Sequence, residues 1–481
     1  MDVIVHLNYI SPYRMATSSV SSPASSSRRD FLRASILSTA VFGAERGLTA
    51  ADSRQSGANA GAARNVIFMV SDGMNHGALT LAKNYRQLFE EKTTHWTRLY
   101  RERPVVRSLA ETFSANSIVT DSAAAASAWG GGHRVNNGTL NILPDGKPVE
   151  PLHLFLQAKG FKTGLVTTAT ITHATPAGFA VNVDKRGNEA EIAQQYLDRR
   201  VDVLLGGGQK FFSDELRKKY AAAGYAQATT RDELLNVNAA AKKPLLGIFS
   251  PSHIPYSIDR NNDAKIAAEV PTLSEMTTTA LNHLDGAGNG FFLMVEGARI
   301  DHAGHQNDAA ASIHDQLAFD DAIATAVEYV DAHPDTLLII TTDHGCGGIQ
   351  LNGVNASKNQ GMAPGIYGAT TQAFETIRGF KRSFEWMKQN DIDGFSGPRL
   401  ADALRNYTGI RFTDDELKEL QGLNQSSVDV LKKHHGIGWT SNNHTGDLVE
   451  FCALGAGSHV FSPFMENREV HNLVIKAMGL G

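Results

Sequence analysis

The chain has 481 residues, of which 42% are hydrophobic and 20% are charged, and its formal net charge is −5. This length is enough for one large α/β domain or two ordinary ones, and the composition excludes a disordered or fibrous protein. No basic block occurs, which argues against nucleic-acid binding. Two cysteines, Cys346 and Cys452, are too few for a disulfide framework or a cysteine-based zinc site. We expect two free thiols, and a single bridge between them stays open.

The first fifty residues have the pattern of an export signal. Residues 27–33 read SRRDFLR, a mildly apolar run follows at 34–44, and small residues follow at 48–51. This order resembles a twin-arginine signal cleaved near Ala50, and a basic disordered tail is the alternative. The apolar run is too short for a permanent membrane anchor. The sequence therefore predicts an exported protein, periplasmic or extracellular, with a flexible Ala/Gly/Ser-rich lead-in at 51–64.

Short apolar runs alternate with helical patterns through the rest of the chain. The runs that predict buried strands are Asn65–Val70, Lys162–Thr167, Val201–Leu205, Leu245–Phe249, Phe291–Val295, Thr336–Thr341 and Leu448–Leu454. The runs that predict helices include Leu152–Gln157, Glu189–Leu197, Leu273–Leu284, Ala309–Tyr329 and Val470–Met478. Such alternation predicts an α/β fold with a large, mostly parallel sheet flanked by helices on both faces.

Residues 350–440 interrupt this alternation. They contain few strand signals and helical signals such as the capping box Thr413-Asp414-Asp415-Glu416. We interpret residues 65–481 as a single catalytic domain that carries a helical insertion at about 350–440.

Polar side chains follow the predicted strands, where sites form in doubly wound folds. One group follows a short β-branched run, Ser117–Thr120, that we also predict as a strand. In chain order the polar residues are Asp72, Asp121, Ser122, His173, Thr175, Glu296, Asp301, His302, His305, Asp343, His344 and His444. Each alone is more often a turn or cap residue, and Asp301 with His305 fits an ordinary helical pair. Together, carboxylates, imidazoles and hydroxyls suit divalent cations, zinc with magnesium above all.

Ser122 is the candidate nucleophile of this set. It begins a predicted helix, where the helix dipole favours developing negative charge and free N–H groups bind an anion. A divalent ion activates a serine hydroxyl as a nucleophile. The small Ala123 and Ala124 leave room for the anion, so the pattern predicts metal-assisted phosphoryl transfer through a phosphoserine.

The chain resembles the alkaline phosphatases in six segments that occur in the family's order. The match extends from about residue 64 to the C-terminus and is weakest through 350–440. The segments are 68–73 (FMVSDG), 119–126 (VTDSAAAA), 173–177 (HATPA), 295–302 (VEGARIDH), 341–344 (TTDH) and 444–446 (HTG).

The resemblance implies a role for each matching residue. It implies that two zinc ions and one magnesium ion are bound by three ligand groups: Asp301, His305 and His444 at the first zinc; Asp72, Asp343, His344 and the Ser122 oxygen at the second; Asp72, Thr175 and Glu296 at the magnesium. It also implies that Arg186 binds phosphate, although Arg186 could lie in a solvated turn. Asp121 either caps the helix or orients Arg186. His76 and His133 lie near these segments, and we predict that neither is a ligand.

Two positions depart from some bacterial members. His173 and His302 stand where those members carry Asp and Lys, and this pairing resembles the animal-type enzymes. The identity of the third metal therefore stays open. His173 could ligate it directly, act through water or hydrogen-bond the phosphate, and His302 could contact phosphate through water.

The predicted function is an exported alkaline phosphatase that hydrolyses small phosphate monoesters. A phosphodiesterase of the same superfamily is the nearest alternative, and a non-catalytic phosphate- or metal-binding protein is a further one. A sulfatase is disfavoured because the x-Pro-x-Arg context of its nucleophile is missing. Family members are often dimeric, so a homodimer is one assembly that the resemblance implies. The natural substrate is not encoded in any motif that we recognise.

Overall fold

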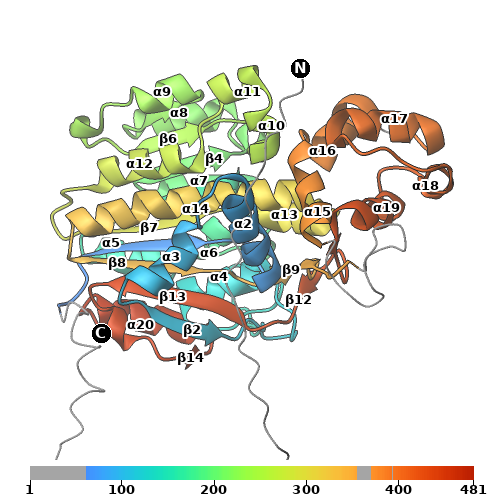
Figure 1. Ribbon diagram of the computed structural model, residues 1–481. Coiled ribbons are helices and arrows are strands. Elements are labelled where there is room, and N and C mark those ends of the chain that lie inside the picture. The colour runs from blue at the N-terminus through green and yellow to red at the C-terminus, as the bar shows by residue number, and fades with distance from the viewer. Residues whose placement is uncertain (1–60, 355–369, 393) are drawn as a thin grey trace, which may run out of the picture. The chain divides into compact units, whose positions relative to one another are not determined.

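A ten-stranded sheet crosses the molecule in the order β14-β2-β13-β8-β1-β7-β3-β4-β6-β5 (Figure 1). The structure is a computed structural model and describes residues 61–354, 370–392 and 394–481. The predicted signal segment and nearly all of the lead-in lie outside the described residues. In the described part of the chain, no helix combines the length and apolarity needed to cross a membrane.

Most neighbouring strands of the sheet are parallel, and β13 runs antiparallel to β2 and β8. The strands are β1 (Asn65–Val70), β2 (Val106–Ala110), β3 (Lys162–Thr170), β4 (Val203–Gly207), β5 (Ala226–Ala228), β6 (Leu245–Ile248), β7 (Phe291–Glu296), β8 (Thr336–Thr341), β13 (Val449–Gly455) and β14 (Phe464–Met465). Two small antiparallel pairs lie outside it: β9 (Gly345–Cys346) with β12 (His444–Thr445), and β10 (Gln350–Leu351) with β11 (Ile437–Gly438).

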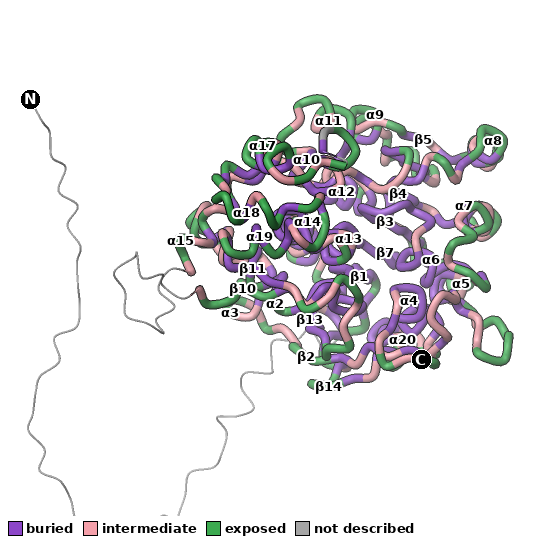
Figure 2. Tube along the Cα trace, turned by 90° about the vertical axis from the view of Figure 1, so that its right-hand side faces the viewer, coloured by how far each residue is buried: buried purple, intermediate pink, exposed green. Residues whose placement is uncertain are grey.

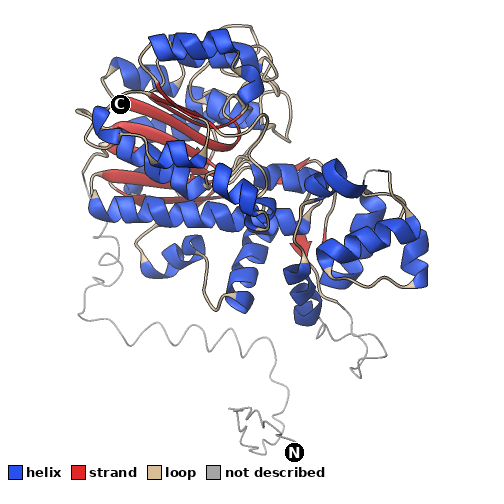
Figure 3. Ribbon diagram, turned by 90° about the horizontal axis from the view of Figure 1, so that it is seen from above, coloured by secondary structure: helices blue, strands red, loops and turns tan. Residues whose placement is uncertain are grey.

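Helices cover both faces of the sheet, as Figure 3 shows from above. The helices are α2 (His76–Phe89), α3 (His95–Glu102), α4 (Ser122–Gly131), α5 (Leu152–Ala158), α6 (Ala174–Gly178), α7 (Glu189–Asp198), α8 (Asp214–Ala222), α9 (Arg231–Leu235), α10 (Ser257–Asn261), α11 (Ala264–Glu269), α12 (Leu273–Leu284), α13 (Arg299–Gln306), α14 (Ala309–Ala332), α15 (Thr370–Glu375), α16 (Phe384–Met387), α17 (Gly397–Thr408), α18 (Asp414–Glu419), α19 (Gln425–His435) and α20 (Glu469–Ala477). The predicted fold class is confirmed.

Two hydrophobic cores lie on opposite faces of the sheet. Ile67 and Met69 of β1 belong to the core that contains α12 and α14, whereas Val66 and Phe68 belong to the core that contains α5 and α20. Every residue of β1 is buried, because helices cover both of its faces (Figure 2). This double burial explains why the central strands are continuous apolar runs.

Within the main sheet, the sequence prediction named one strand that is absent and missed three, and it also missed the two-residue strands β9 to β12. Residues 117–120 are not a strand, because side chains form hydrogen bonds with the main-chain groups that would otherwise pair with a neighbouring strand. Asn137 Nδ2 donates to the Val119 carbonyl, and the Asp121 N–H donates to Asn137 Oδ1. The missed strands β2, β5 and β14 lie toward the edges of the sheet and are short. Short strands near an edge have weak apolar periodicity, so their pairing depends on tertiary contacts.

The described residues of the 350–440 region form mostly helices, among them α15 to α19. The predicted capping box at Thr413 and Glu416 is present at the start of α18. Hydrogen bonds tie this region to the rest of the chain, among them one from the Ser383 hydroxyl to Asp259 and one from the Phe384 N–H to Asp308. The region therefore packs on the helices of the sheet rather than standing apart.

One buried carboxylate joins three elements at the β2 side of the sheet. Glu450 of β13 accepts hydrogen bonds from Arg107 of β2 and Tyr100 of α3, and it pairs with His76 of α2. Burial raises the pKa of Glu450, but the bonds from His76, Arg107 and Tyr100 outweigh it and bring the pKa to about 2. His76 thus has a structural partner, and His133 is exposed.

We predict that Glu450→Gln destabilises the fold. The folded-state pKa lies below the ordinary 4.5, so the ionised carboxylate stabilises the fold above that pH, and the stabilisation is lost as pH falls toward 2. The substitution should lower the free energy of unfolding at pH 7 by about 1–3 kcal/mol. It should also flatten the pH dependence between 4.5 and 2. Urea unfolding with a chelator present measures both. Glu215→Gln, at an exposed position, is the control, and an unchanged midpoint for Glu450→Gln at pH 7 contradicts the prediction.

Candidate active site

Ser122 begins α4 and is buried, with 1% of its surface exposed. Asp121 caps the helix, because its Oδ1 accepts from the Ala124 N–H at 2.9 Å and its carbonyl accepts from the Ala125 N–H. Within the described part of the chain, the N–H groups of Ser122 and Ala123 find no acceptor. The start of α4 therefore offers two free donors beside a serine hydroxyl, which is an arrangement that binds anions.

The small residues farther along α4 have a packing role. A Cβ on Gly130 would lie 2.0 Å from the carbonyl oxygen of Gly178, and a Cβ on Gly178 would lie 2.5 Å from the Cβ of Ala126. Helices α4 and α6 therefore approach closely, and α6 carries Thr175. The alanine-rich sequence brings two parts of the site together.

Asp72, Asp343 and His344 converge on the Ser122 hydroxyl. The Ser122 Oγ lies 3.2 Å from His344 Nε2, which lies 3.0 Å from Asp343 Oδ2 and 3.9 Å from Asp72 Oδ1. Asp72 follows β1, and the Asp343-His344 pair follows the adjacent parallel strand β8, so both strands end at the same edge. The candidate ligand atoms of the three residues lie within 4.8 Å of one another.

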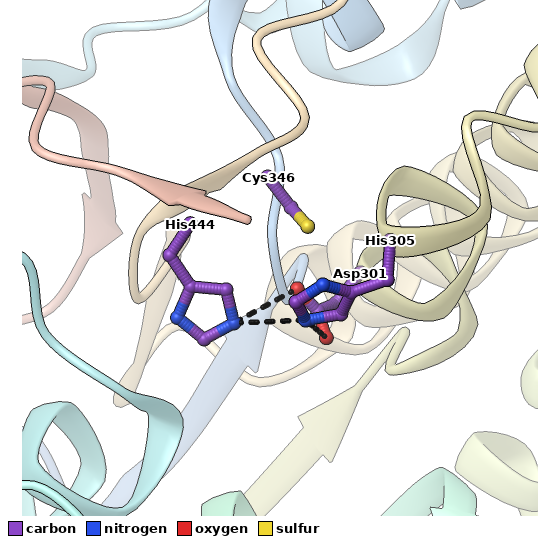
Figure 4. A group of neighbouring side chains, drawn as sticks. All are labelled: Asp301, His305, Cys346 and His444. Atoms are coloured by element: carbon purple, nitrogen blue, oxygen red, sulfur yellow. Dashed lines mark hydrogen bonds and ion pairs between the residues drawn. The ribbon is translucent and has the colours of Figure 1, made fainter. Parts of the chain in front are cut away.

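A second cluster contains Asp301, His305 and His444 (Figure 4). Asp301 and His305 lie one turn apart on α13, and His444 lies on β12. His305 Nε2 is 3.4 Å from Asp301 Oδ2, and His444 Nε2 is 3.5 Å from Asp301 Oδ1. His444 precedes β13, and because β13 runs antiparallel to β8 this end of it lies at the edge where the parallel strands end.

The hydrogen bonds of the two histidines leave their Nε2 lone pairs facing each other. His305 Nδ1 lies 2.8 Å from the Asn442 carbonyl oxygen, and His444 Nδ1 lies 2.8 Å from the Thr120 carbonyl oxygen. A carbonyl only accepts, so each Nδ1 carries the proton and each neutral ring has its lone pair on Nε2. The two Nε2 atoms are 3.1 Å apart. Lone pairs at this distance repel unless a proton or a metal ion lies between them, and the hydrogen bond to Asp301 raises the pKa of His305 to about 9.

The third cluster is formed by Asp72, Glu296 and His173, with Thr175 beside them. Thr175 Oγ1 donates to Asp72 Oδ2 at 3.3 Å, and the Thr167 hydroxyl donates to Glu296 Oε2. Asp72 thus belongs to two clusters, with one carboxylate oxygen in each. Thr167 is a contact that the sequence prediction missed, because a threonine inside a buried strand carries no signal of its own.

Arg186 lies against both Asp121 and His173. Its Nη1 donates to Asp121 Oδ2 at 3.0 Å, and its Nη2 lies 3.2 Å from His173 Nε2. Asp121 Oδ2 also accepts from the Gly138 N–H at 3.0 Å. The Asp121 carboxylate therefore caps α4 with one oxygen and holds the guanidinium with the other, so both contacts that the sequence left as alternatives are present.

His302 has a partner that the sequence prediction did not identify. Arg299 Nη1 lies 2.8 Å from His302 Nδ1, and Arg299 Nη2 donates to Glu385 Oε1 of α16 at 2.7 Å. A guanidinium only donates, so His302 Nδ1 accepts and the neutral ring carries its proton on Nε2. That ring has no lone pair free for a metal and instead offers an N–H donor.

Four carboxylates without sufficient hydrogen bonds mark the shared space of the clusters. Asp72 Oδ1, Glu296 Oε1, Asp301 Oδ1 and Asp343 Oδ2 are buried and have no hydrogen-bond partner among the described residues. Burial raises the pKa of Asp72, and the carboxylates of Asp343, Asp301 and Glu296 raise it further. Burial also raises the pKa of Glu296 to about 7. Unpaired buried oxygens of this kind fit divalent cations, which remove the repulsion.

A buried serine at a helix N-terminus, surrounded by carboxylates and imidazoles at the carboxyl edge of a parallel sheet, defines a metal-dependent hydrolase of the α/β class. The comparisons with known proteins give the particular family. The family model "Alkaline phosphatase" matches residues 63–480, and the chain therefore belongs to the alkaline phosphatase family. It is a phosphoric monoester hydrolase that acts on small phosphomonoesters.

Individual relatives agree with this assignment. Alkaline phosphatase 3 of Bacillus subtilis is 31% identical over 435 residues, which cover 86% of this chain and 89% of the relative. The repressible alkaline phosphatase of Saccharomyces cerevisiae is 31% identical over 449 residues, with coverages of 84% and 78%. The crystal structure of Thermus thermophilus alkaline phosphatase superposes with a TM-score of 0.79 at 31% identity and covers 91% of this chain and 96% of that one.

The structure thus brings all of the proposed site residues to one edge of the sheet, and it adds one. Cys346 lies in the cluster of Asp301, His305 and His444, whereas the sequence analysis considered this cysteine only for a disulfide. Both cysteines are free and buried, as expected. The position of Cys346 two residues after His344 was the one sequence signal that could have indicated this. The pairing of β9 with β12 is what brings Cys346 to the cluster.

Substitutions at Asp121 should separate its two contacts. Asn caps helices as well as Asp, so Asp121→Asn should keep the α4 cap, while its Nδ2 can no longer accept from Arg186 or from the Gly138 N–H. Asp121→Ala also loses the cap and should cost about 0.5–2 kcal/mol of stability more than Asp121→Asn. We expect the inhibition constant for inorganic phosphate to rise several-fold in both variants, measured by competition in a phosphatase assay. Equal phosphate inhibition in wild type and Asp121→Asn would show that the Arg186 contact has no role in binding.

Proposed function

We propose that the chain hydrolyses phosphate monoesters in two displacements, through a phosphoserine on Ser122. The observation that carries the proposal is the position of the Ser122 hydroxyl. It is buried at the start of α4, next to two free N–H groups and 3.2 Å from His344 Nε2. Two carboxylate oxygens without hydrogen bonds, Asp72 Oδ1 and Asp343 Oδ2, lie 3.9 and 3.0 Å from the same His344 Nε2. A hydroxyl with these neighbours is a nucleophile rather than a helix cap, since Asp121 already caps the helix.

Two zinc ions and one magnesium ion fit the donor atoms. The first zinc would be held by Asp301, His305 and His444, the second by Asp72, Asp343 and His344, and the magnesium by Asp72, Glu296 and Thr175, with His173 beside it. When bound, such cations supply charge neutralisation to the attacking and leaving oxygens. His and carboxylate donors suit zinc, whereas an all-oxygen set suits magnesium. At the third site, His173 is the one donor that suits zinc better than magnesium.

The residues of the chain position the phosphate for an in-line attack. Ser122 Oγ gives up its proton to solvent and bonds to phosphorus, while the bond from phosphorus to the alcohol oxygen breaks on the opposite side and that oxygen takes up a proton. Water then attacks the phosphoserine from that side and loses a proton to solvent, the bond from phosphorus to Oγ breaks, and Ser122 Oγ takes up a proton. The Arg186 guanidinium is held by Asp121 and suits two phosphate oxygens. The N–H groups of Ser122 and Ala123 and the Nε2–H of His302 are further donors. Charge neutralisation and positioning supply most of the catalysis in phosphoryl transfer.

A phosphodiesterase of the same superfamily is the alternative that the site favours less. A diester has one charged oxygen fewer for the site to recognise. Arg186 provides a positive charge for a further phosphate oxygen, and a cation held by the third cluster of Asp72, Glu296 and His173 would provide another, which supports the monoester. The complete set of nucleophile and ligands also argues against a non-catalytic binding protein.

We predict that Ser122→Ala lowers turnover of an aryl phosphate monoester by at least about 10³-fold, because no covalent intermediate can form. Protein loaded with zinc and magnesium is assayed on the monoester and on the matching diester at equal concentration. Acid quenching of wild type with labelled substrate should trap a phosphoserine that the variant lacks. Removal of metal by a chelator should abolish activity, and zinc with magnesium should restore it.

Ser127→Ala is the matched control for this experiment. Ser127 lies on the same helix, is buried, and accepts a hydrogen bond from the Asn141 N–H, so the substitution removes a hydroxyl without removing the nucleophile. Near-wild-type turnover of Ser122→Ala, or faster diester than monoester hydrolysis by wild type, contradicts the proposal.

We also propose that the protein is exported to the periplasm or the cell exterior through a twin-arginine signal. The support is the SRRDFLR pattern at 27–33 and the apolar run after it. Replacing Arg28 and Arg29 by Lys should leave the full-length protein in the cytoplasm of an expression host with a twin-arginine pathway, as fractionation and immunoblotting would show. The reverse replacement, of Lys218 and Lys219 by Arg, is the control. Normal processing of the Arg28→Lys/Arg29→Lys variant rejects this route.

A further inference from the structure

The first metal cluster contains a fourth donor that the proposed function does not use. Cys346 is 1% exposed and free, and its Sγ lies within 4.8 Å of candidate ligand atoms of Asp301, His305 and His444. In Figure 4 the sulfur points toward the carboxylate and the two rings. Cys452, the other cysteine, lies on β13 and belongs to none of the clusters.

Main-chain pairing holds the sulfur at this place. Cys346 on β9 is the direct cross-strand partner of His444 on β12, so both side chains lie on one face of the small sheet. Gly304 of α13 leaves the space that the thiol fills, because a Cβ there would lie 2.9 Å from Sγ. A cross-strand pair and a one-turn helical pair thus contribute two donors each.

The other three residues of the cluster leave one corner of a tetrahedron open when Asp301 binds through one oxygen. The two Nε2 atoms are 3.1 Å apart, His305 Nε2 lies 3.4 Å from Asp301 Oδ2, and His444 Nε2 lies 3.5 Å from the other oxygen, Oδ1. Zinc bonds of about 2.0–2.1 Å to nitrogen and oxygen give tetrahedron edges of roughly 3.3 Å, which each of these separations fits. Asp301 Oδ1 is buried without a hydrogen-bond partner, which indicates independently that a cation is expected here. The sulfur is the remaining donor of the cluster.

We propose that Cys346 is the fourth protein ligand of the first metal site when no phosphoester or phosphate oxygen occupies that position. This inference rests on the proposed function, since it concerns the same metal. Cys346 gives up its thiol proton to solvent and bonds through the thiolate. An incoming phosphate oxygen displaces the sulfur, which then takes up a proton. A sulfur donor favours zinc, cobalt or cadmium over magnesium and manganese, so Cys346 also sets the metal preference.

Cobalt(II) is the probe for the test, because a thiolate bound to it absorbs in the near ultraviolet and imidazole or carboxylate does not. The metal-free full chain is loaded with three equivalents of cobalt(II), which suffice for the three sites. We expect a sulfur-to-cobalt absorption in wild type and in Cys452→Ser, and its loss in Cys346→Ser and Cys346→Ala. Saturating inorganic phosphate should weaken the absorption in wild type.

Metal affinity provides a second measurement. In chelator competition, Cys346→Ser should bind zinc at the first metal site about tenfold more weakly than wild type does. Zinc binding by Cys452→Ser should be unchanged. Absence of the absorption in fully loaded wild type overturns the inference and leaves Cys346 as a neighbour of Asp301 only. Absorption that persists unchanged at saturating phosphate overturns the exchange.

The outcome is independent of the test of the proposed function. The cobalt spectrum requires no turnover, so it can fail while Ser122→Ala still abolishes hydrolysis. Conversely, the sulfur absorption can be present in a chain whose Ser122→Ala variant keeps its activity, which would reject the phosphoserine mechanism alone.

Discussion

Mutual repulsion among buried carboxylates is the constraint on which this structure depends. Asp72, Glu296, Asp301 and Asp343 are each at most 4% exposed and come from different strand ends or helices at one sheet edge. Each has a buried oxygen without a hydrogen bond. Such an arrangement is stable only with cations or protons among the oxygens, and the raised pKa of Asp72 expresses that conflict. The same concentration of negative charge makes this edge a candidate site for divalent cations.

Main-chain carbonyls decide what the histidines can do. The carbonyls of Asn442 and Thr120 accept hydrogen bonds from the Nδ1–H groups of His305 and His444 and leave both Nε2 lone pairs free. Arg299 donates to the Nδ1 lone pair of His302, so this ring offers an Nε2–H donor instead. The irregular segment before Ser122 therefore contributes to the site directly, because its Thr120 carbonyl orients the ring of His444.

One route by which the helical region after β10 contacts the site leads through Arg299. Glu385 of α16 binds Arg299, and Arg299 stacks on Tyr256 and contacts His302. Arg299 is 1% exposed, so its charge depends on Glu385 for compensation. Substitutions in this helical region can therefore alter the position of His302, the proposed phosphate donor, without contacting a proposed metal ligand.

The sequence by itself determined the central strands, the long helices and the residue types of the site. Helix coverage of both faces makes strands such as β1 and β8 continuous apolar runs, and motif segments carry the nucleophile and ligands next to them. Tertiary structure alone decided which polar atoms meet. Partners more than ten residues away decide the pairing of β2, which is second from the edge of the sheet, the side-chain bonds of residues 117–120 and the pairing of Cys346 with His444. Local periodicity has no access to such partners, so neither the role of Asp121 as both cap and clamp nor the fourth donor of the first metal cluster could be inferred before the chain was folded.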